Sequence, residues 1–206
     1  MTPVVFIHWG ETNYLNIARR QSVKYNKATV AILPNTDFAY SMEVDRWFIL
    51  RDFMKNSSIE RCLYVDSDVL LYSNVDWHFR LCDIAFSGFH SGHTMFINNP
   101  MVLVDLCGYI EDNIHDTSLV EETRKRLPNN VFADSIGDMV LLNNFAEKYK
   151  TVYRFQDTSE LGYDHNINTE GLPEMKDGIP YRNNQRLHSL HFQGGAKHMM
   201  KDYANV

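Results

Sequence analysis

The chain has 206 residues, of which 44% are hydrophobic, 13% aromatic and 22% charged, and its formal net charge is −6. Because a domain usually contains roughly 100–150 residues, this length predicts a single domain. The apolar fraction excludes a generally disordered chain. The acidic balance argues against a nucleic-acid partner, since binding a phosphate backbone needs a basic face that releases counterions.

The cysteines indicate a reducing compartment. Cys62, Cys82 and Cys107 are an odd set without Cys-x-x-Cys spacing, whereas a secreted domain with disulfides normally has an even set. We therefore expect buried thiols and a cytoplasmic protein. The N-terminus has no basic region and no apolar stretch near the roughly 20 residues of a membrane span. We expect no signal peptide, no transmembrane segment, and a monomer or weak oligomer.

The first 75 residues alternate between strand and helix patterns. Apolar runs predict strands over 4–8, 29–33 and 62–65. Apolar positions at helical spacing predict helices over 12–25 and 42–54. This order predicts an α/β fold with a mixed, mainly parallel central sheet flanked by helices.

The second half of the chain continues the pattern less regularly. The stretch 115–133 is charged and polar, so we expect a surface loop there. Beyond Asp157 we expect loops with little regular structure until the apolar run 187–192. The other expected elements are strands over 84–86, 95–97 and 152–155, and helices over 100–114 and 135–149.

Two carboxylates, Asp66 and Asp68, follow the apolar run 62–65. An Asp pair at this spacing is expected about once by chance in a chain of this composition, so its position carries the signal. Ligands bind at the carboxyl ends of strands in open α/β sheets. A divalent cation with oxygen ligands, Mn²⁺ or Mg²⁺, would remove the cost of burying both carboxylates. The alternative is a solvated turn.

A second cluster runs from His191 to Lys197. Gly194 and Gly195 allow the backbone to approach an anion closely, and Lys197 adds positive charge there. A metal-binding His191 beside Lys197 would suit a diphosphate leaving group, because metal and lysine both stabilise its developing charge. The alternative is a structural or surface histidine.

Four segments, in the correct order, resemble the retaining nucleotide-sugar transferases of the glycogenin type, glycosyltransferase family 8, which have the GT-A fold. Compact glycosyltransferases of chlorella viruses, which decorate a capsid glycan, have a similar build; for a viral protein the compartment would be the host cytoplasm. The matching segments are Asp66-Ser67-Asp68, residues 91–100, residues 137–143, and His191-Phe192-x-Gly194-x-x-Lys197.

The resemblance implies transfer of a hexose or deoxyhexose from a UDP-sugar donor to a hydroxyl of a glycan acceptor, with retention and with Mn²⁺ as cofactor. Residues 1–75 would form the nucleotide-binding half and residues 83–206 the sugar and acceptor half. The implied roles are Mn²⁺ binding by Asp66, Asp68 and His191, diphosphate contacts from Gly194 and Lys197, stacking of Tyr14 on uracil, and contact of Asp138 with the donor sugar.

The sequence also departs from the family pattern. Met139 stands where the family usually has Gln, and His198-Met199 replaces its Pro-Trp. Glu43 stands near a usually basic donor-binding position, and we expect Arg46, one helical turn later, to supply that charge.

Other functions remain open at this point. Asp138 could act as the general base of an inverting transferase, or be a carboxylate that favours a helix N-terminus. A metal-dependent phosphatase of the haloacid dehalogenase type also begins with Asp-x-Asp, but Leu70 stands where that family has Thr or Val. A non-catalytic nucleotide-sugar-binding module is the third alternative. Since nine residues follow Lys197, we expect a near-minimal catalytic core, to which further domains could be attached.

Overall fold

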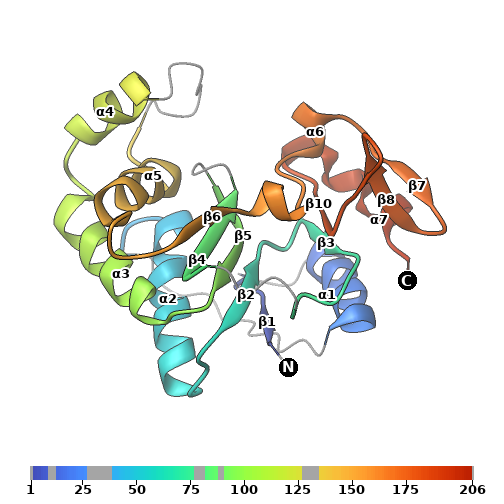
Figure 1. Ribbon diagram of the computed structural model, residues 1–206, viewed down its shortest axis with the longest axis horizontal. Coiled ribbons are helices and arrows are strands. Elements are labelled where there is room, and N and C mark those ends of the chain that lie inside the picture. The colour runs from blue at the N-terminus through green and yellow to red at the C-terminus, as the bar shows by residue number, and fades with distance from the viewer. Residues whose placement is uncertain are drawn as a thin grey trace.

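A five-stranded sheet with the order β1-β2-β5-β4-β6 lies at the centre of the computed structural model (Figure 1). The structure describes residues 2–8, 13–26, 39–76, 82–87, 91–126 and 135–205. The strand expected over 29–33 lies outside these residues. The strands of the sheet are β1 (Val4–Val5), β2 (Cys62–Val65), β4 (Ile84–Ser87), β5 (Ser91–Ile97) and β6 (Phe155–Asp157).

The central sheet is mixed but mainly parallel. β1 is parallel to β2, and β4 is parallel to β6. β5 lies between β2 and β4 and is antiparallel to both. The other four strands therefore run in one direction, which confirms the α/β class expected from the sequence.

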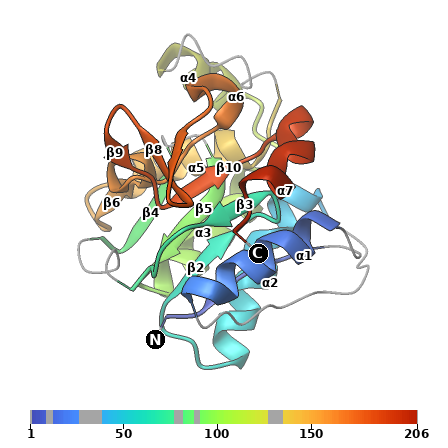
Figure 2. The same ribbon diagram turned by 90° about the vertical axis from the view of Figure 1, so that its right-hand side faces the viewer.

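Both faces of the sheet are buried, which explains the nearly continuous apolar strands. Because side chains alternate along a strand, Cys62 and Tyr64 face one core cluster while Leu63 and Val65 face the other. The first cluster is formed with α2 (Met42–Asn56), α3 (Met101–Asn113) and α5 (Asp138–Tyr149). On the second face lie α1 (Asn13–Tyr25) and α7 (Met200–Tyr203), as Figure 2 shows.

A short second sheet holds the C-terminal segment next to the end of β2 by strand pairing. β3 (Val69–Leu71) is antiparallel to β10 (Ser189–His191), and Val69 is paired with His191. The Phe192 N–H donates to the Asp68 carbonyl over 2.9 Å. This register places the segment that follows His191 against the turn that contains Asp66 and Asp68.

The expectation of irregular loops between Asp157 and residue 187 was wrong. This stretch contains two-residue turns whose residues all have positive φ: Asp177 (51°) and Gly178 (75°), then Asn183 (50°) and Asn184 (64°). Asp-Gly and Asn-rich pairs favour such tight hairpins. The elements formed are a 3₁₀ helix (Thr158–Leu161), α6 (Ile167–Glu170), and a sheet of β7 (Glu174–Lys176), β8 (Ile179–Arg182) and β9 (Gln185–Arg186).

The expected loop over 115–133 was also wrong in part. α4 (Ser118–Arg126) occupies most of its described portion and buries Leu119, Val120 and Thr123. Residues 127–134 lie outside the described parts of the chain.

Smaller differences concern the ends of elements. α5 begins at Asp138 rather than at 135, and β6 begins at Phe155 because Val152 lies in the exposed turn after α5. Cys62, Cys82 and Cys107 are buried and free, as expected. In the described parts of the chain, every helix is too short or too polar to traverse a bilayer.

Candidate active site

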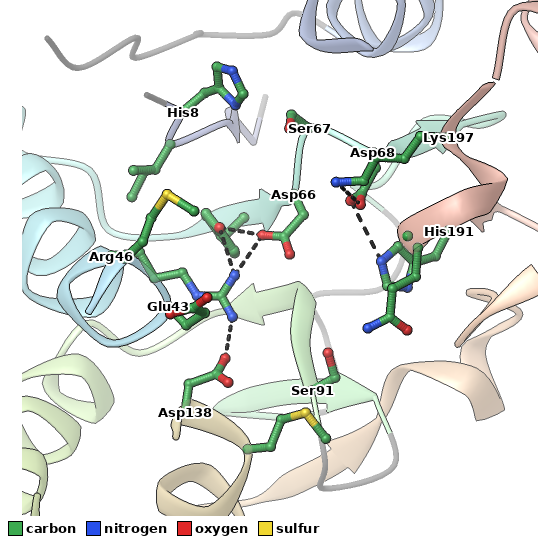
Figure 3. A pocket seen from close by; sticks show the side chains of 16 residues that line it. His8, Glu43, Arg46, Asp66, Ser67, Asp68, Ser91, Asp138, His191 and Lys197 are labelled. Carbon is green, nitrogen blue, oxygen red and sulfur yellow. Dashed lines mark hydrogen bonds and ion pairs between the residues drawn. The ribbon is translucent and has the colours of Figure 1, made fainter. Parts of the chain in front are cut away.

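A cavity of about 420 Å³ opens at the carboxyl end of β2 (Figure 3). Its walls come from the end of β1, the first turns of α2 and α5, the turn between β2 and β3, and the segment after β10. Apart from the end of β1, these are places where the sequence predicted ligand-binding residues. The predicted site residues that line the cavity are Arg46, Asp66, Asp68, Asp138, His191, Gly194 and Lys197.

Arg46 connects two carboxylates on one side of the cavity. Its Nη1 donates to Asp66 Oδ1 over 2.8 Å, and its Nη2 forms a short ion pair with Asp138. The Tyr64 hydroxyl donates to the same Asp66 oxygen over 2.5 Å. The sequence therefore places three separate elements, α2, β2 and α5, around a single guanidinium.

Burial and pairing shift the pKa values of this network. Burial alone would lower the pKa of Arg46, but Asp66, Tyr64 and Asp138 raise it well above its ordinary value, so the guanidinium stays charged. Burial, reinforced by Asp66, raises the pKa of Tyr64, which remains a hydrogen-bond donor. Burial also raises the pKa of Asp138, and the ion pair with Arg46 opposes that rise.

Asp68 has different partners on the opposite side of the cavity. Its Oδ1 lies 3.6 Å from His191 Nε2, and its Oδ2 lies 3.1 Å from Lys197 Nζ. The pairing of Val69 with His191 causes the first proximity, because Asp68 directly precedes Val69. The two carboxylates of Asp66-Ser67-Asp68 thus point to separate clusters of charge.

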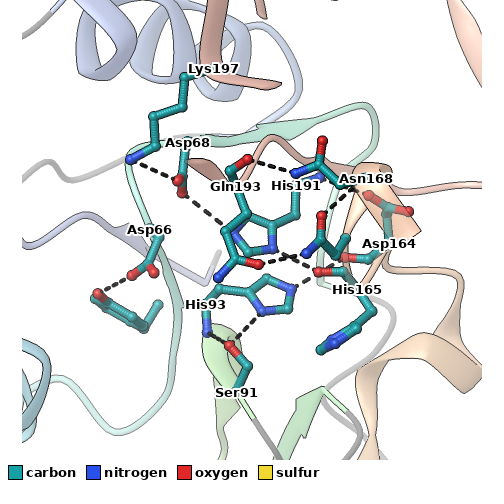
Figure 4. Close-up of polar contacts among 12 residues, drawn as sticks. Asp66, Asp68, Ser91, His93, Asp164, His165, Asn168, His191, Gln193 and Lys197 are labelled. Atoms are coloured by element: carbon teal, nitrogen blue, oxygen red, sulfur yellow. Dashed lines mark hydrogen bonds and ion pairs between the residues drawn. The ribbon is translucent and has the colours of Figure 1, made fainter. Parts of the chain in front are cut away.

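The hydrogen bonds of His191 determine its tautomer (Figure 4). Its Nδ1 lies 2.7 Å from the His165 carbonyl oxygen, which can only accept. Nδ1 therefore carries a hydrogen, and in the neutral ring Nε2 presents its lone pair toward Asp68. A metal-binding histidine commonly has this arrangement, in which the other ring nitrogen donates to a carbonyl.

Neighbouring residues hold the His191 ring and backbone in place. His93 stacks on the ring with centroids 4.0 Å apart and an interplanar angle of 12°. Burial, followed by the adjacent His191 and His165, lowers the pKa of His93 well below its usual range, so His93 is neutral. The His191 N–H donates to the buried carboxylate of Asp164 over 3.0 Å, and Arg182 pairs with the same carboxylate over 2.5 Å.

The predicted Mn²⁺ ligands are brought together in part. Asp68 and His191 offer an oxygen and an imidazole nitrogen, donor types that suit Mn²⁺. Asp66 lines the same cavity, but its Oδ1 is held by Tyr64 and Arg46. Within the described ranges, no three His, Cys, Asp or Glu side chains converge closely enough to enclose a metal ion. The chemistry of Asp68 and His191 fits a cation, whereas the third ligand faces Arg46.

Two predicted contacts with the donor differ in their placement. Gly194 lines the cavity and adopts a φ of +58° at the start of a 3₁₀ helix (Gly194–Met199), where a residue without a side chain is favoured. Tyr14 lies on α1 and packs against the core, apart from the residues that line the cavity. Its stacking on a base remains a prediction, and Gly10 to Thr12 lie outside the described residues.

The cavity is also lined by His8, Tyr64 and Ser91, which are not among the predicted site residues. His8 Nε2 is buried and has no hydrogen-bond partner among the described residues. Burial, followed by the charge of Lys197, lowers the pKa of His8. The signal that could have identified His8 is its position directly after the apolar residues 4–7 of the first strand, at the same edge of the sheet as Asp66.

No protein-family model matches the sequence, and no curated protein matches it significantly. Solved structures match its fold. The apo form of the glycosyltransferase GlyE of Streptococcus pneumoniae TIGR4 superposes with a TM-score of 0.52 at 14% identity, over 100% of this chain and 60% of that chain. The present chain thus spans about three fifths of the length of GlyE.

Two further glycosyltransferase structures have the same fold. One is involved in the glycosylation of the major capsid of PBCV-1 and matches with a TM-score of 0.52 at 13% identity, over 98% of both chains. The other is apo WbbM, a bifunctional glycosyltransferase, with a TM-score of 0.51 at 12% identity over 98% of this chain and 48% of that chain. The chain therefore has a mixed α/β fold shared with glycosyltransferases from several sources.

Proposed function

We propose that this chain is a glycosyltransferase that uses a UDP-sugar donor, a divalent cation, Mn²⁺ or Mg²⁺, and a hydroxyl of a glycan acceptor. The observation that carries the proposal is the gathering of Arg46, Asp66, Asp68, Asp138, His191 and Lys197 around one cavity at the carboxyl end of β2. The fold shared with glycosyltransferases supports the same reaction class, and the residues of the cavity supply the groups that such a reaction needs.

The two charge clusters suit the two ends of a sugar diphosphate. Asp68 and His191 would hold the cation, and Lys197 would neutralise a diphosphate oxygen. When bound, the cation stabilises negative charge on the departing diphosphate. Arg46 and Asp138 would orient the hydroxyls of the donor sugar, because they offer paired donors and acceptors on the other side of the cavity.

We infer that the anomeric configuration is retained. Asp138 is held by Arg46, which suits a fixed contact to the sugar better than a free nucleophile. The acceptor oxygen would form its bond to the anomeric carbon on the face from which the diphosphate departs. The leaving diphosphate oxygen would take the proton of the acceptor hydroxyl.

One observation favours a second mechanism. The raised pKa of Asp138 would strengthen this carboxylate as a general base, which an inverting enzyme requires. NMR of the first-formed product separates the two mechanisms. A product with the anomeric configuration of the donor supports retention, and the opposite anomer assigns the base role to Asp138.

Release of UDP from a panel of UDP-sugars in the presence of Mn²⁺ tests the proposal. We expect Asp68→Asn to reduce release by about 100-fold or more, because even partners of metal ligands cost 10–100-fold. Asp52→Asn is the matched control, since Asp52 is exposed and pairs with Arg51 outside the cavity. No UDP release from any donor by the wild-type protein would overturn the enzymatic proposal and leave a nucleotide-sugar-binding module. Release of phosphate from phosphomonoesters would indicate a phosphatase instead.

A further inference from the structure

Each carboxylate oxygen of Asp68 faces a nitrogen of the C-terminal segment (Figure 4). His191 Nε2 lies 3.6 Å from Oδ1, and Lys197 Nζ lies 3.1 Å from Oδ2. The side chain of Asp68 is only 10% exposed, whereas that of Lys197 is 39% exposed. Asp68 is thus fixed in the wall of the cavity, and Lys197 is the partner that has room to move.

The ammonium group of Lys197 would repel a divalent cation that binds to Asp68. A divalent cation bound to Asp68 and His191 would lie within a few ångströms of the ammonium group. Like charges at about 4 Å repel substantially even when solvent screens them. Binding of a divalent cation to Asp68 therefore favours departure of Lys197 from the carboxylate.

A diphosphate offers Lys197 an alternative partner. Lys197 lies on the 3₁₀ helix (Gly194–Met199), and Gly194 at the start of this helix lines the same cavity. A phosphate oxygen accepts a charge-assisted hydrogen bond from an ammonium group at least as well as a carboxylate does. The diphosphate would therefore both attract Lys197 and free Asp68.

We propose that Lys197 couples the binding of the divalent cation to the binding of the nucleotide diphosphate. Without nucleotide, Lys197 competes with the cation for Asp68; with nucleotide, Lys197 pairs with the diphosphate and the competition ends. By linkage, the cation raises the affinity for the nucleotide by the same factor as the nucleotide raises the affinity for the cation. This inference rests on the proposed function, because it assumes that the cavity binds both ligands.

Titration with Mn²⁺, monitored by the electron paramagnetic resonance signal of free Mn²⁺, tests the coupling. The wild-type protein, Lys197→Met and Lys197→Arg are each titrated without UDP and with saturating UDP, after correction for Mn²⁺ bound by free UDP. We expect Lys197→Met to bind Mn²⁺ about tenfold more tightly without UDP, within the usual range of coupling factors. We expect UDP to increase the Mn²⁺ affinity of Lys197→Met less than that of the wild-type protein, and Lys197→Arg to behave like the wild-type protein.

Lys201→Met is the matched control, because Lys201 is an exposed lysine on α7, four residues later. It removes one positive charge without removing a partner of Asp68. If Lys197→Met and the wild-type protein bind Mn²⁺ with equal affinity, the coupling is overturned. It is also overturned if Lys201→Met gains as much Mn²⁺ affinity as Lys197→Met does. If the proposed metal site itself is wrong, the result is different: neither the wild-type protein nor Lys197→Met binds Mn²⁺, with or without UDP. That result also overturns the coupling.

Discussion

Arg46 and Asp138 form a buried ion pair between the first turns of α2 and α5, although 92 positions separate them in the sequence. The same guanidinium pairs with Asp66 at the end of β2, so one cation is shared by two carboxylates. Arg46 also lies over the ring of Trp47, 4.5 Å from its centroid. The network ties two helices to the central strand at the edge of the sheet where the cavity opens.

Replacing Arg46 by Met should destabilise the fold strongly. Asp66 and Asp138 would lose their shared cation, and removing one partner of a buried pair typically costs about 3–5 kcal/mol. Urea denaturation would measure the loss in the free energy of unfolding. Arg51→Met is the control on the same helix, because Arg51 forms a more exposed pair with Asp52, a kind of pair that contributes about 0–1 kcal/mol. Equal losses in the two variants would show that the Arg46 network does not stabilise the fold.

Gly92 on β5 should not tolerate a side chain. A Cβ atom there would lie 2.4 Å from two ring carbons of Trp47, which is fully buried. We expect Gly92→Ala to destabilise the protein by about 1–3 kcal/mol, since overpacking forces the core to shift. The thermal midpoint of unfolding would report the change.

Alanine at Gly108 is the control, and we expect it to have the opposite effect on stability. It lies within α3, and a Cβ atom there would meet no heavy atom within 4 Å. Gly108→Ala should stabilise the protein by about 0.5–1 kcal/mol, because alanine is the better helix former. If both substitutions change stability in the same direction, close packing of β5 on Trp47 is not the cause.

The central fold could be predicted from the sequence because its signals are local. The apolar residues 62–65 and the carboxylates that follow them identify a buried strand and a site at its end. The hairpins at Asp177-Gly178 and Asn183-Asn184 also have local signals, but the same residue types are common in irregular loops, so composition alone does not distinguish the two.

The charge pairs of the site could not be predicted in the same way. Asp68 meets His191 only because β3 and β10 pair in one register, and Arg46 meets Asp138 only because α2 and α5 cover the same face. Both contacts depend on tertiary structure. The spacing of residues along the chain does not determine which carboxylate pairs with Arg46 and which with Lys197. The sequence therefore predicted most of the charged residues of the site, but it did not predict that Asp66 and Asp68 have separate partners.

Stability should decrease with rising pH because of Glu170 on α6. Burial, followed by the neighbouring Asp164, raises the pKa of Glu170 to about 7 from an ordinary value of 4.5, despite the contact with Arg182. Between these values the folded protein binds more protons than the unfolded chain, so the free energy of unfolding falls as pH rises.

Glu170→Gln isolates this contribution, because it keeps the shape of the side chain and removes its titration. Urea denaturation at pH 5 and pH 8 should show a smaller loss of stability in Glu170→Gln than in the wild-type protein. Glu174→Gln is the control, since Glu174 is exposed on β7. An unchanged pH dependence in Glu170→Gln would show that this carboxyl group does not retain its proton on folding.

Gly194, at the mouth of the cavity, should be sensitive to alanine for a conformational reason alone. Its φ of +58° lies in the left-handed region, while a Cβ atom there would meet no heavy atom within 4 Å. Gly194→Ala should therefore cost about 1 kcal/mol in the free energy of unfolding, and Gly194→Asn less, because Asn tolerates this region. Gly195 is the adjacent control: it has equal space but no positive φ, so Gly195→Ala should change stability by less than about 0.5 kcal/mol. Urea denaturation of the three variants would measure these differences. Equal effects of alanine at the two positions would mean that the backbone before Lys197 does not require the left-handed conformation.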